Sequence, residues 1–366
     1  MRILADLLGL FLILTVLWDA FETVILPRRV TRRFRLTGVF YSSIWVPWSY
    51  LVRHLARLRR RDKYLGLFGP LSLLLLLGMW AIGLIVGYAL LFWSEGARLN
   101  APGENVGFLT YLYLSGTTFF TLGYGDITPV FPLGRTLAII EAANGFGLLA
   151  IVISYLPILY QAFSRREASI SLLDARAGSP SSAVELLRRH RAEDSFDDLN
   201  RLLSEWERWS AELLESHLSY PVLCYFRSQH DNQSWLGALT TVLDTCALVM
   251  VGVDHAPVWQ ARMTFAMARH AVVDIAQVFK TKPSDVQCCD TRLSSGDLSR
   301  LQAILKENGI QLSDGPETER RLLELRLMYE PYVSALAEWL MMPLPPWILP
   351  PDAIDNWKTS AWGRIQ

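Results

Sequence analysis

Cysteines are few in this 366-residue sequence, and their pattern excludes some classes of protein. The four that occur are irregularly spaced, and no pair has the usual separation of metal ligands: Cys224, Cys246, Cys288 and Cys289. They predict reduced thiols in a cytoplasmic compartment rather than a disulfide framework. A G-x-G-x-x-G turn after a strand is also lacking, so nothing indicates a Rossmann-type nucleotide-binding domain.

Charged residues are also scarce, at 19% of the chain, and they are unevenly distributed. Residues 1–163 are mostly apolar, whereas residues 164–366 carry most of the acids. Between residues 27 and 63, eleven Lys or Arg stand against a single acid, Asp62. The formal net charge is zero, and a basic block beside apolar segments is typical of a membrane surface rather than of nucleic-acid binding.

Three apolar segments, residues 3–26, 70–93 and 135–162, are long enough to cross a bilayer, which takes about 20 residues. We expect Pro70 to open the second helix, because the first turn of a helix tolerates proline. We expect the basic sequence Ser164-Arg165-Arg166 to end the third at the cytoplasmic face. A signal peptide is the alternative for residues 3–26, but neither a basic start nor a cleavage site is clear.

Residues 39–52 are aromatic, are interrupted by Pro47 and have arginines on both sides. If this segment crossed the bilayer, one basic cluster would lie outside, against the positive-inside rule. An interfacial helix on the cytoplasmic face therefore fits better, although a spanning helix remains open. With both basic borders inside, the first helix places the N-terminus outside. The flanking bases are Arg28, Arg29, Arg32, Arg33, Arg35, Arg53, Arg57, Arg59, Arg60, Arg61 and Lys63.

After residue 165 the apolar spacing is helical rather than strand-like. The expected helices are Leu186–Leu218, Trp235–Val253, Val258–Phe279 and Glu317–Met341. Trp235–Val253 is apolar enough for a membrane, but Asp244 and three threonines within it favour a buried core helix. The chain thus divides into an N-terminal helix with a basic interfacial segment (1–63), a pore domain (64–164), a helical cytoplasmic domain (165–342) and an extended proline-rich tail (343–366).

The loop between the second and third spans reads Thr121-Leu122-Gly123-Tyr124-Gly125-Asp126. A pore that passes potassium quickly replaces the water around the ion with successive rings of oxygen ligands. Backbone carbonyls line up along one axis when alternate residues adopt φ > 0, which glycine accepts at little steric cost. The short apolar stretch 105–121 before the loop predicts a helix whose negative C-terminal end faces the ion.

These residues resemble the potassium-channel signature Thr-Val-Gly-Tyr-Gly-Asp, and the resemblance covers about residues 65–163. It implies an outer helix, a pore helix, a filter and an inner helix, and it makes Thr121, Leu122, Gly123, Tyr124 and Gly125 the ion-binding filter. The side chains of Leu122 and Tyr124 are expected to brace the loop against surrounding protein. Leu122 departs conservatively from the common valine.

Other residues are candidates for supporting the filter or bending the inner helix. Asp126, Thr117 and Thr118 lie beside the filter, and Thr117 stands where some channels carry a carboxylate. Glu141 and Asn144 are polar residues in a span, and Glu141 is expected behind the pore helix near Thr117 or Thr118, or else at the cavity or a subunit contact. The candidate hinges are Gly145, which matches the bending glycine of simple bacterial channels, Gly147 and Pro157.

The sequence therefore predicts an all-α integral membrane protein that conducts potassium passively as a homotetramer. The expected location is the plasma (inner) membrane, with the C-terminal domain in the cytoplasm. Three identical subunits and the bilayer are the expected partners, with an unidentified cytoplasmic ligand left open. No cofactor, metal beyond the permeant K⁺ or enzymatic activity is expected. The alternatives are a weakly selective cation channel or a membrane receptor with a vestigial pore.

Two further groups of residues favour plain structural roles. His255 and His270 with Cys288 and Cys289 have no spacing that requires zinc. Asp19 and Glu22 are expected to pair with Arg28 or Arg29, or to lie in the interface.

Overall fold

The structure, a computed structural model, describes residues 2–26, 35–55, 58–96, 99–101, 106–191, 196–230, 232–285 and 292–350. These residues form an all-α membrane protein that divides into two compact units, Met1–Gln161 and Ala162–Gln366. We call the first the membrane unit and the second the helical unit. The expected N-terminal domain (1–63) and residues 64–161 of the expected pore domain (64–164) lie together in the membrane unit.

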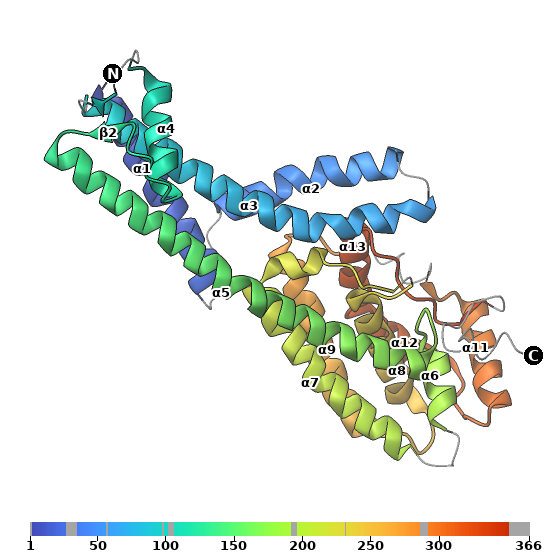
Figure 1. Ribbon diagram of the computed structural model, residues 1–366. Coiled ribbons are helices and arrows are strands. Elements are labelled where there is room, and N and C mark those ends of the chain that lie inside the picture. The colour runs from blue at the N-terminus through green and yellow to red at the C-terminus, as the bar shows by residue number, and fades with distance from the viewer. Residues whose placement is uncertain are drawn as a thin grey trace, which may run out of the picture. The chain divides into compact units, whose positions relative to one another are not determined.

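The membrane unit is built from long helices, a short pore-type helix and one small antiparallel pairing (Figure 1). Its elements are α1 (Arg2–Ala20), the π-helical turn η1 (Phe21–Ile25), α2 (Leu36–Leu55), α3 (Leu58–Ser94), β1 (Leu99–Asn100), α4 (Phe108–Phe119), β2 (Thr128–Pro129) and the first part of α5 (Pro132–Ala177). The strands pair Leu99 with Pro129 and Asn100 with Thr128.

The helical unit contains the end of α5 and the elements α6 (Ala183–His190), α7 (Asp197–Ser219), η2 (Pro221–Tyr225), α8 (Trp235–Gly252), α9 (Val258–Val278), α11 (Ser295–Glu307), α12 (Pro316–Leu327) and α13 (Glu330–Leu340). Helices α7, α8 and α9 pack against one another. Nearly every residue of α8 is buried within this unit, which confirms the expected core helix.

Among the described residues, four helices are long and apolar enough to cross a membrane: Arg2–Ile25, Arg61–Ser94, Pro132–Ala177 and Trp235–Gly252. The first three contain the spans expected from the sequence. The fourth is α8, which is 83% buried inside the helical unit, whereas the first three expose apolar side chains over much of their length.

Helix α1 packs closely along the C-terminal part of α3 because small residues line their contact. A Cβ placed on Gly87 would lie 2.7 Å from a side-chain carbon of Ile13, and one on Gly83 would lie 2.8 Å from Val16. Near the other end of this contact, Asp19 is buried and accepts a hydrogen bond from the Trp80 indole at 2.9 Å.

Two acids of the first helix have partners within the described residues. Asp19 also accepts hydrogen bonds from the backbone and hydroxyl of Thr37, at 3.1 and 2.5 Å, so it joins α1 to α2 and α3. Glu22 accepts from the Trp18 indole at 2.7 Å, and its carboxylate lies 4.0 Å from Arg35. The suggested partners Arg28 and Arg29 lie outside the described residues.

Pro70 does not open a helix, contrary to the sequence prediction. Helix α3 begins at Leu58 and carries Pro70 in its interior. Proline there removes one i→i−4 hydrogen bond. The helix continues because α2 packs along its N-terminal part, where the ring centroids of Trp45 and Phe68 are 4.7 Å apart.

The basic sequence after the third span does not end that helix, so this prediction was also wrong. Helix α5 runs without interruption from Pro132 to Ala177. Arg166 is buried, and its guanidinium donates to the carbonyl oxygens of Leu223 and Phe226 at 2.9 and 2.8 Å. Because the Arg166 guanidinium is hydrogen-bonded to buried carbonyl oxygens, it can leave water, and α5 continues as a helix into the helical unit.

The helical unit differs from the expected helices in three places. The segment 186–218 is two helices, α6 and α7, and the segment 317–341 is also two, α12 and α13, with a turn at Met328–Tyr329. Helix α11 was not expected, because its apolar positions are few. Residues 342–350 are not helical, in line with their prolines.

Several sequence predictions fall outside the described part of the chain. They concern Cys288 and Cys289, the tail beyond residue 350, the bases at positions 28, 29, 32, 33 and 57, and the side chains of Arg59 and Arg60.

Candidate pore site

The short helix α4 and the loop after it form the centre of the candidate site. Residues 121, 123 and 125 all have positive φ, of 55°, 56° and 77°. This alternation agrees with the geometry expected for carbonyls that point along one axis. Glycine accepts it freely, whereas the β-branched Thr121 is strained there, at a cost of about 1–3 kcal/mol.

The C-terminal end of α4 is tied directly to the start of the loop. The amides of Thr121 and Leu122 donate to the carbonyl oxygens of Thr118 and Thr117, at 3.0 and 2.8 Å. The loop therefore leaves the helix at the end where the helix dipole is negative. Thr117 and Thr118 hold the loop through their backbone carbonyls, since the Thr117 hydroxyl donates to the Leu114 carbonyl at 3.0 Å within its own helix.

Asp126 closes the outer end of the loop. Tyr113, in α4, donates its hydroxyl proton to Asp126 Oδ2 at 2.8 Å, and the Ile127 amide donates to Asp126 Oδ1 at 3.0 Å. The sequence alone did not identify this bond. The only signal for it was an aromatic hydroxyl on the helix that precedes the loop.

The side chains of Leu122 and Tyr124 are not closely packed against other described residues of this chain. Leu122 is 53% exposed and Tyr124 is 68% exposed. A large apolar and a large aromatic side chain at the tip of an ordered loop mark an interaction surface. Within the described residues, the surrounding protein that was expected to cover these two side chains is not found.

Glu141 reaches the back of the pore helix, one turn earlier than expected. It is fully buried, and its Oε1 lies within hydrogen-bonding distance of the Ser115 hydroxyl. The Ser115 hydroxyl is also 2.7 Å from the Ile85 carbonyl oxygen of α3. A hydroxyl has one proton and a carbonyl only accepts, so both bonds form together only when the Glu141 carboxyl carries a proton.

Two neighbours of Glu141 fasten the same face of α5. The Asn144 amide donates to the Tyr88 hydroxyl of α3 at 2.5 Å. A Cβ placed on Gly145 would overlap the carbonyl oxygen of Phe119, at the end of α4. Gly145 thus allows a close approach of two backbones, and its role as a hinge stays a prediction.

The other candidate hinges have no such contact. No atom lies within 4 Å of a Cβ placed on Gly147. Pro157 lies in the interior of α5, where it removes one backbone hydrogen bond. Their assignment as hinges stays a prediction.

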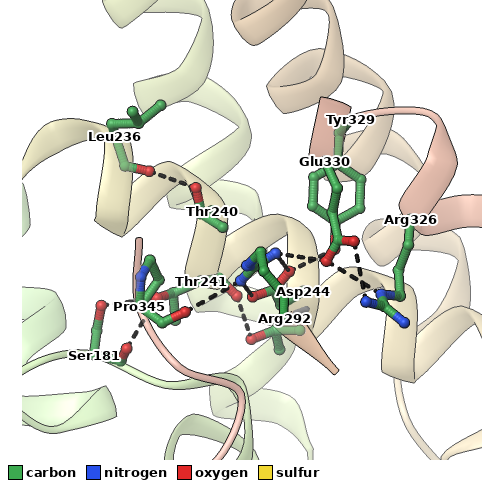
Figure 2. Close-up of polar contacts among 11 residues, drawn as sticks. Ser181, Leu236, Thr240, Thr241, Asp244, Arg292, Arg326, Tyr329, Glu330 and Pro345 are labelled. Carbon is green, nitrogen blue, oxygen red and sulfur yellow. Dashed lines mark hydrogen bonds and ion pairs between the residues drawn. The ribbon is translucent and has the colours of Figure 1, made fainter. Parts of the chain in front are cut away.

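A second polar cluster lies wholly inside the helical unit (Figure 2). Arg292 binds Asp244 with both Nη atoms, at 3.3 and 2.7 Å, and its Nη1 is 2.6 Å from Glu330. Arg326 binds Glu330 at 3.1 Å, and the Tyr329 hydroxyl donates to Asp244 at 2.5 Å. Two cations thus balance two carboxylates, and burial raises the pKa of Tyr329 well above its usual value.

This cluster also holds the segment after α13. Arg292 donates to the Pro345 carbonyl oxygen at 3.2 Å, and the guanidinium groups of Arg292 and Arg326 lie 5.6 and 5.5 Å from the centre of the Trp347 ring. Because the charges of the cluster are paired with one another, its role is structural: it holds the segment after α13 against the helical unit. In the described parts of the chain, no group of three His, Cys, Asp or Glu residues could hold a metal ion.

Comparisons with known proteins agree with this geometry. The sequence profile of a family described as "Ion channel" matches residues 75–162. The chain is similar to Protein LctB of Geobacillus stearothermophilus, 30% identical over 129 residues, and to Protein LctB of Bacillus caldotenax, 31% identical over 129 residues. Each match covers 32% of this chain and 87% of the relative.

A longer match leads to a protein without an assigned activity. The chain is 24% identical over 195 residues to the "Uncharacterized membrane protein YdjJ" of Bacillus subtilis (strain 168). That match covers 53% of this chain and 56% of the relative, so the chain spans about half of its length. No solved structure matches the chain.

Proposed function

Since this chain belongs to the ion channel family, we propose that it is one subunit of a potassium-selective channel whose pore is formed by four identical chains. The observation that carries the proposal is the positive φ at residues 121, 123 and 125. Alternation of this kind turns successive carbonyl oxygens toward a common axis. Neutral carbonyl rings are the ligands that replace the hydration shell of K⁺ in potassium filters.

Four chains are proposed because one chain supplies one loop. A single loop offers one oxygen to each ring, whereas a dehydrated K⁺ needs several oxygens in every ring. The exposure of Leu122 and Tyr124 supports the same conclusion, because neighbouring loops would cover side chains that this chain leaves open.

The proposal also assigns an orientation and a route for gating. The bases at Arg53, Arg61 and Lys63 favour the cytoplasmic side for the inner ends of the spans, which places the helical unit in the cytoplasm and the channel in the plasma (inner) membrane. Because α5 is continuous from the filter region into the helical unit, a change in that unit can move the inner helix. No catalytic step is assigned to the chain.

Ion flux from liposomes that contain the purified full-length protein tests this function. We expect fast K⁺ flux, little Na⁺ flux and block by barium. Gly123→Ala should abolish K⁺ flux, because alanine at positive φ is strained and turns a carbonyl from the axis. Gly116→Ala is the matched control, because no atom lies within 4 Å of the added Cβ.

Each alternative predicts a different result in the same assay. Equal K⁺ and Na⁺ flux would mean a weakly selective cation channel. The absence of flux from folded, reconstituted protein would favour a receptor with a vestigial pore. Cross-linking that yields monomers only would contradict the shared axis.

A further inference from the structure

Helix α3 is much longer than a membrane crossing requires. Its 37 residues span about 55 Å at about 1.5 Å per residue, against a hydrocarbon core of about 30 Å. Helix α1 accompanies only its C-terminal part, from Ser94, which binds Asp6, to Trp80, which binds Asp19. The N-terminal part of α3 therefore extends beyond the level at which α1 ends.

Helix α2 turns this extension into a hairpin, which Figure 1 shows as two adjacent blue helices. The inner face of the hairpin is packed, because Trp45, Leu65 and Phe68 are all nearly fully buried. The rings of Trp45 and Trp48 lie 4.7 and 6.1 Å from the ring of Phe68. We call α2 together with residues 61–72 of α3 the hairpin.

The outer face of the hairpin is apolar and exposed. On α2, Val39, Val46 and Tyr50 recur at helical spacing, with exposures of 53, 53 and 63%. On α3, Tyr64 and Leu67 are 41 and 52% exposed. Large apolar side chains that are exposed on both helices mark a contact with a membrane or a partner.

On α3 this apolar face continues into the membrane-spanning surface. From Leu67 the exposed stripe passes through Leu71 and Leu74, at 40 and 62%, to Ile82, at 63%. These later residues lie in the part of α3 that crosses the bilayer. Because this apolar stripe continues directly from residues that face lipid, its hairpin part is expected to contact lipid rather than water.

The end of the hairpin is basic. Arg53 and His54 close α2, and Arg61 and Lys63 lie near the start of α3. The Arg61 guanidinium donates to the Arg53 carbonyl oxygen at 2.7 Å, so the two helices present these bases together. Asp62 is the single acid between residues 27 and 63. Aromatic and apolar residues beside bases are typical of segments in the headgroup layer.

We propose that the hairpin lies against the bilayer and binds anionic phospholipid headgroups through Arg53, Arg61 and Lys63. Its apolar face enters the boundary between headgroups and acyl chains, and its bases meet the lipid phosphates. Bases near an anionic surface each strengthen binding by up to about fivefold. Pro70 lies where the hairpin joins the spanning part of α3, and proline is the usual cause of a bend that such an arrangement needs.

The position of the hairpin is tested with the full-length protein in liposomes of phosphatidylcholine and phosphatidylglycerol. An environment-sensitive dye is attached at Val46→Cys or Leu67→Cys, in a background in which Cys288 and Cys289 are serine; Cys224 and Cys246 are buried. We expect blue-shifted emission that nitroxide-labelled lipids quench. Leu323→Cys, at an exposed apolar residue of the helical unit, is the control and should stay unquenched.

Two outcomes of this measurement would overturn the proposal. Emission typical of water at both hairpin positions would show that the face does not meet lipid. A blue shift that lipid nitroxides do not quench, and that disappears when residues 168–366 are removed, would show that the helical unit covers the hairpin instead. Neither readout requires ion conduction, so the result is independent of the proposed channel function.

The preference for anionic lipid is tested by the ratio of quenching from nitroxide-labelled phosphatidylglycerol and phosphatidylcholine. We expect about a tenfold preference at low salt, which falls in 0.5 M KCl because salt screens the charges. Replacing Arg53, Arg61 and Lys63 together by glutamine should lower the ratio to about one. Arg262→Gln with Arg269→Gln, on an exposed face of α9, is the control. An unchanged ratio in the triple variant would contradict the headgroup assignment.

Discussion

The loop at residues 121–126 and the charge cluster of the helical unit differ in how far their side chains are covered by the rest of the chain. The cluster buries Asp244 and Glu330 almost completely, and each carboxylate meets an arginine of the same chain. The loop leaves Leu122 and Tyr124 exposed. A buried charge must be paired where it lies, whereas exposed apolar side chains can remain uncovered in a single chain. Under the proposed function, the cluster is complete within one chain and the loop is completed by neighbouring copies.

The largest effect is expected where the cluster loses one partner. Arg292→Ala leaves Asp244 and Glu330 short of a cation in a buried site, which should destabilise the helical unit by about 3–5 kcal/mol. Amide hydrogen exchange should accelerate in α8 and α13, since both contribute carboxylates to the cluster.

An exposed arginine serves as the control for that experiment. Arg320 pairs with Glu317 and Glu324, and its side chain is 59% exposed. Arg320→Ala should leave hydrogen exchange in the helical unit nearly unchanged, because exposed ion pairs contribute little to stability. Similar protection losses in the two variants would mean that burial does not distinguish these pairs.

A smaller effect is expected at the contact between α5 and the pore helix. Gly145→Ala places a methyl group on the Phe119 carbonyl oxygen, so the end of α4 must shift and the filter with it. We expect a cost of about 1–3 kcal/mol and K⁺ flux at least about tenfold lower. Gly147→Ala meets no atom within 4 Å and should retain flux. Equal losses in both variants would favour a flexible hinge over close packing.

The helical unit should also lose stability in acid through His217. Its Nε2 accepts from Arg166 at 3.1 Å, and its Nδ1 donates to the Leu213 carbonyl at 2.9 Å. Burial, and then the charge of Arg166, hold the pKa of His217 well below its usual 6.5. The unfolded chain therefore takes up a proton below about pH 6.5 that the folded chain does not.

The stability should thus be full above this pH and fall by about 1.4 kcal/mol per pH unit below it. His217→Gln keeps an acceptor and a donor without titrating, so urea midpoints between pH 7 and pH 5 should vary less than in the unsubstituted protein. His270→Gln, at a 61% exposed ring, is the control. Identical pH profiles for all three proteins would refute the role of His217.

The smallest effect is expected from Glu141, whose role depends on a proton rather than on a charge. Glu141→Leu removes the link to Ser115 and should shorten single-channel openings several-fold, because one hydrogen bond contributes about 1 kcal/mol. Glu141→Gln can still donate to Ser115 and should behave nearly as the unsubstituted channel. Single-channel recordings that show equal damage from both changes would mean that the carboxyl acts in its ionised form.

Much of the pore could be predicted from the sequence because its signals are local. Gly123 and Gly125 at alternate positions require a special backbone, and uninterrupted apolar runs indicate spans. The Tyr113–Asp126 bond could not be read in this way, since thirteen residues separate its partners. Nor could the contact between Gly145 and Phe119, which depends on how two helices cross.

The helical unit was harder to predict because its decisive contacts join distant residues. Arg166 looked like a cytoplasmic stop, yet carbonyls more than fifty residues away bury it. Arg292 and Asp244 lie 48 residues apart, and neither position indicates its partner. The break between α12 and α13 coincides with Pro331 in the first turn of α13, a local signal that apolar spacing alone does not include.

The sequence by itself determined the spans, the loop and its glycines, since hydrophobic length and backbone freedom belong to single segments. Only the tertiary structure decided that α3 starts before Pro70, that α5 continues past Arg166 and that Glu141 meets Ser115. Where a helix ends, and whether a polar side chain finds a hydrogen-bond partner, depends on contacts with residues far away in the sequence. The free energy of such contacts cannot be read from a short stretch of sequence.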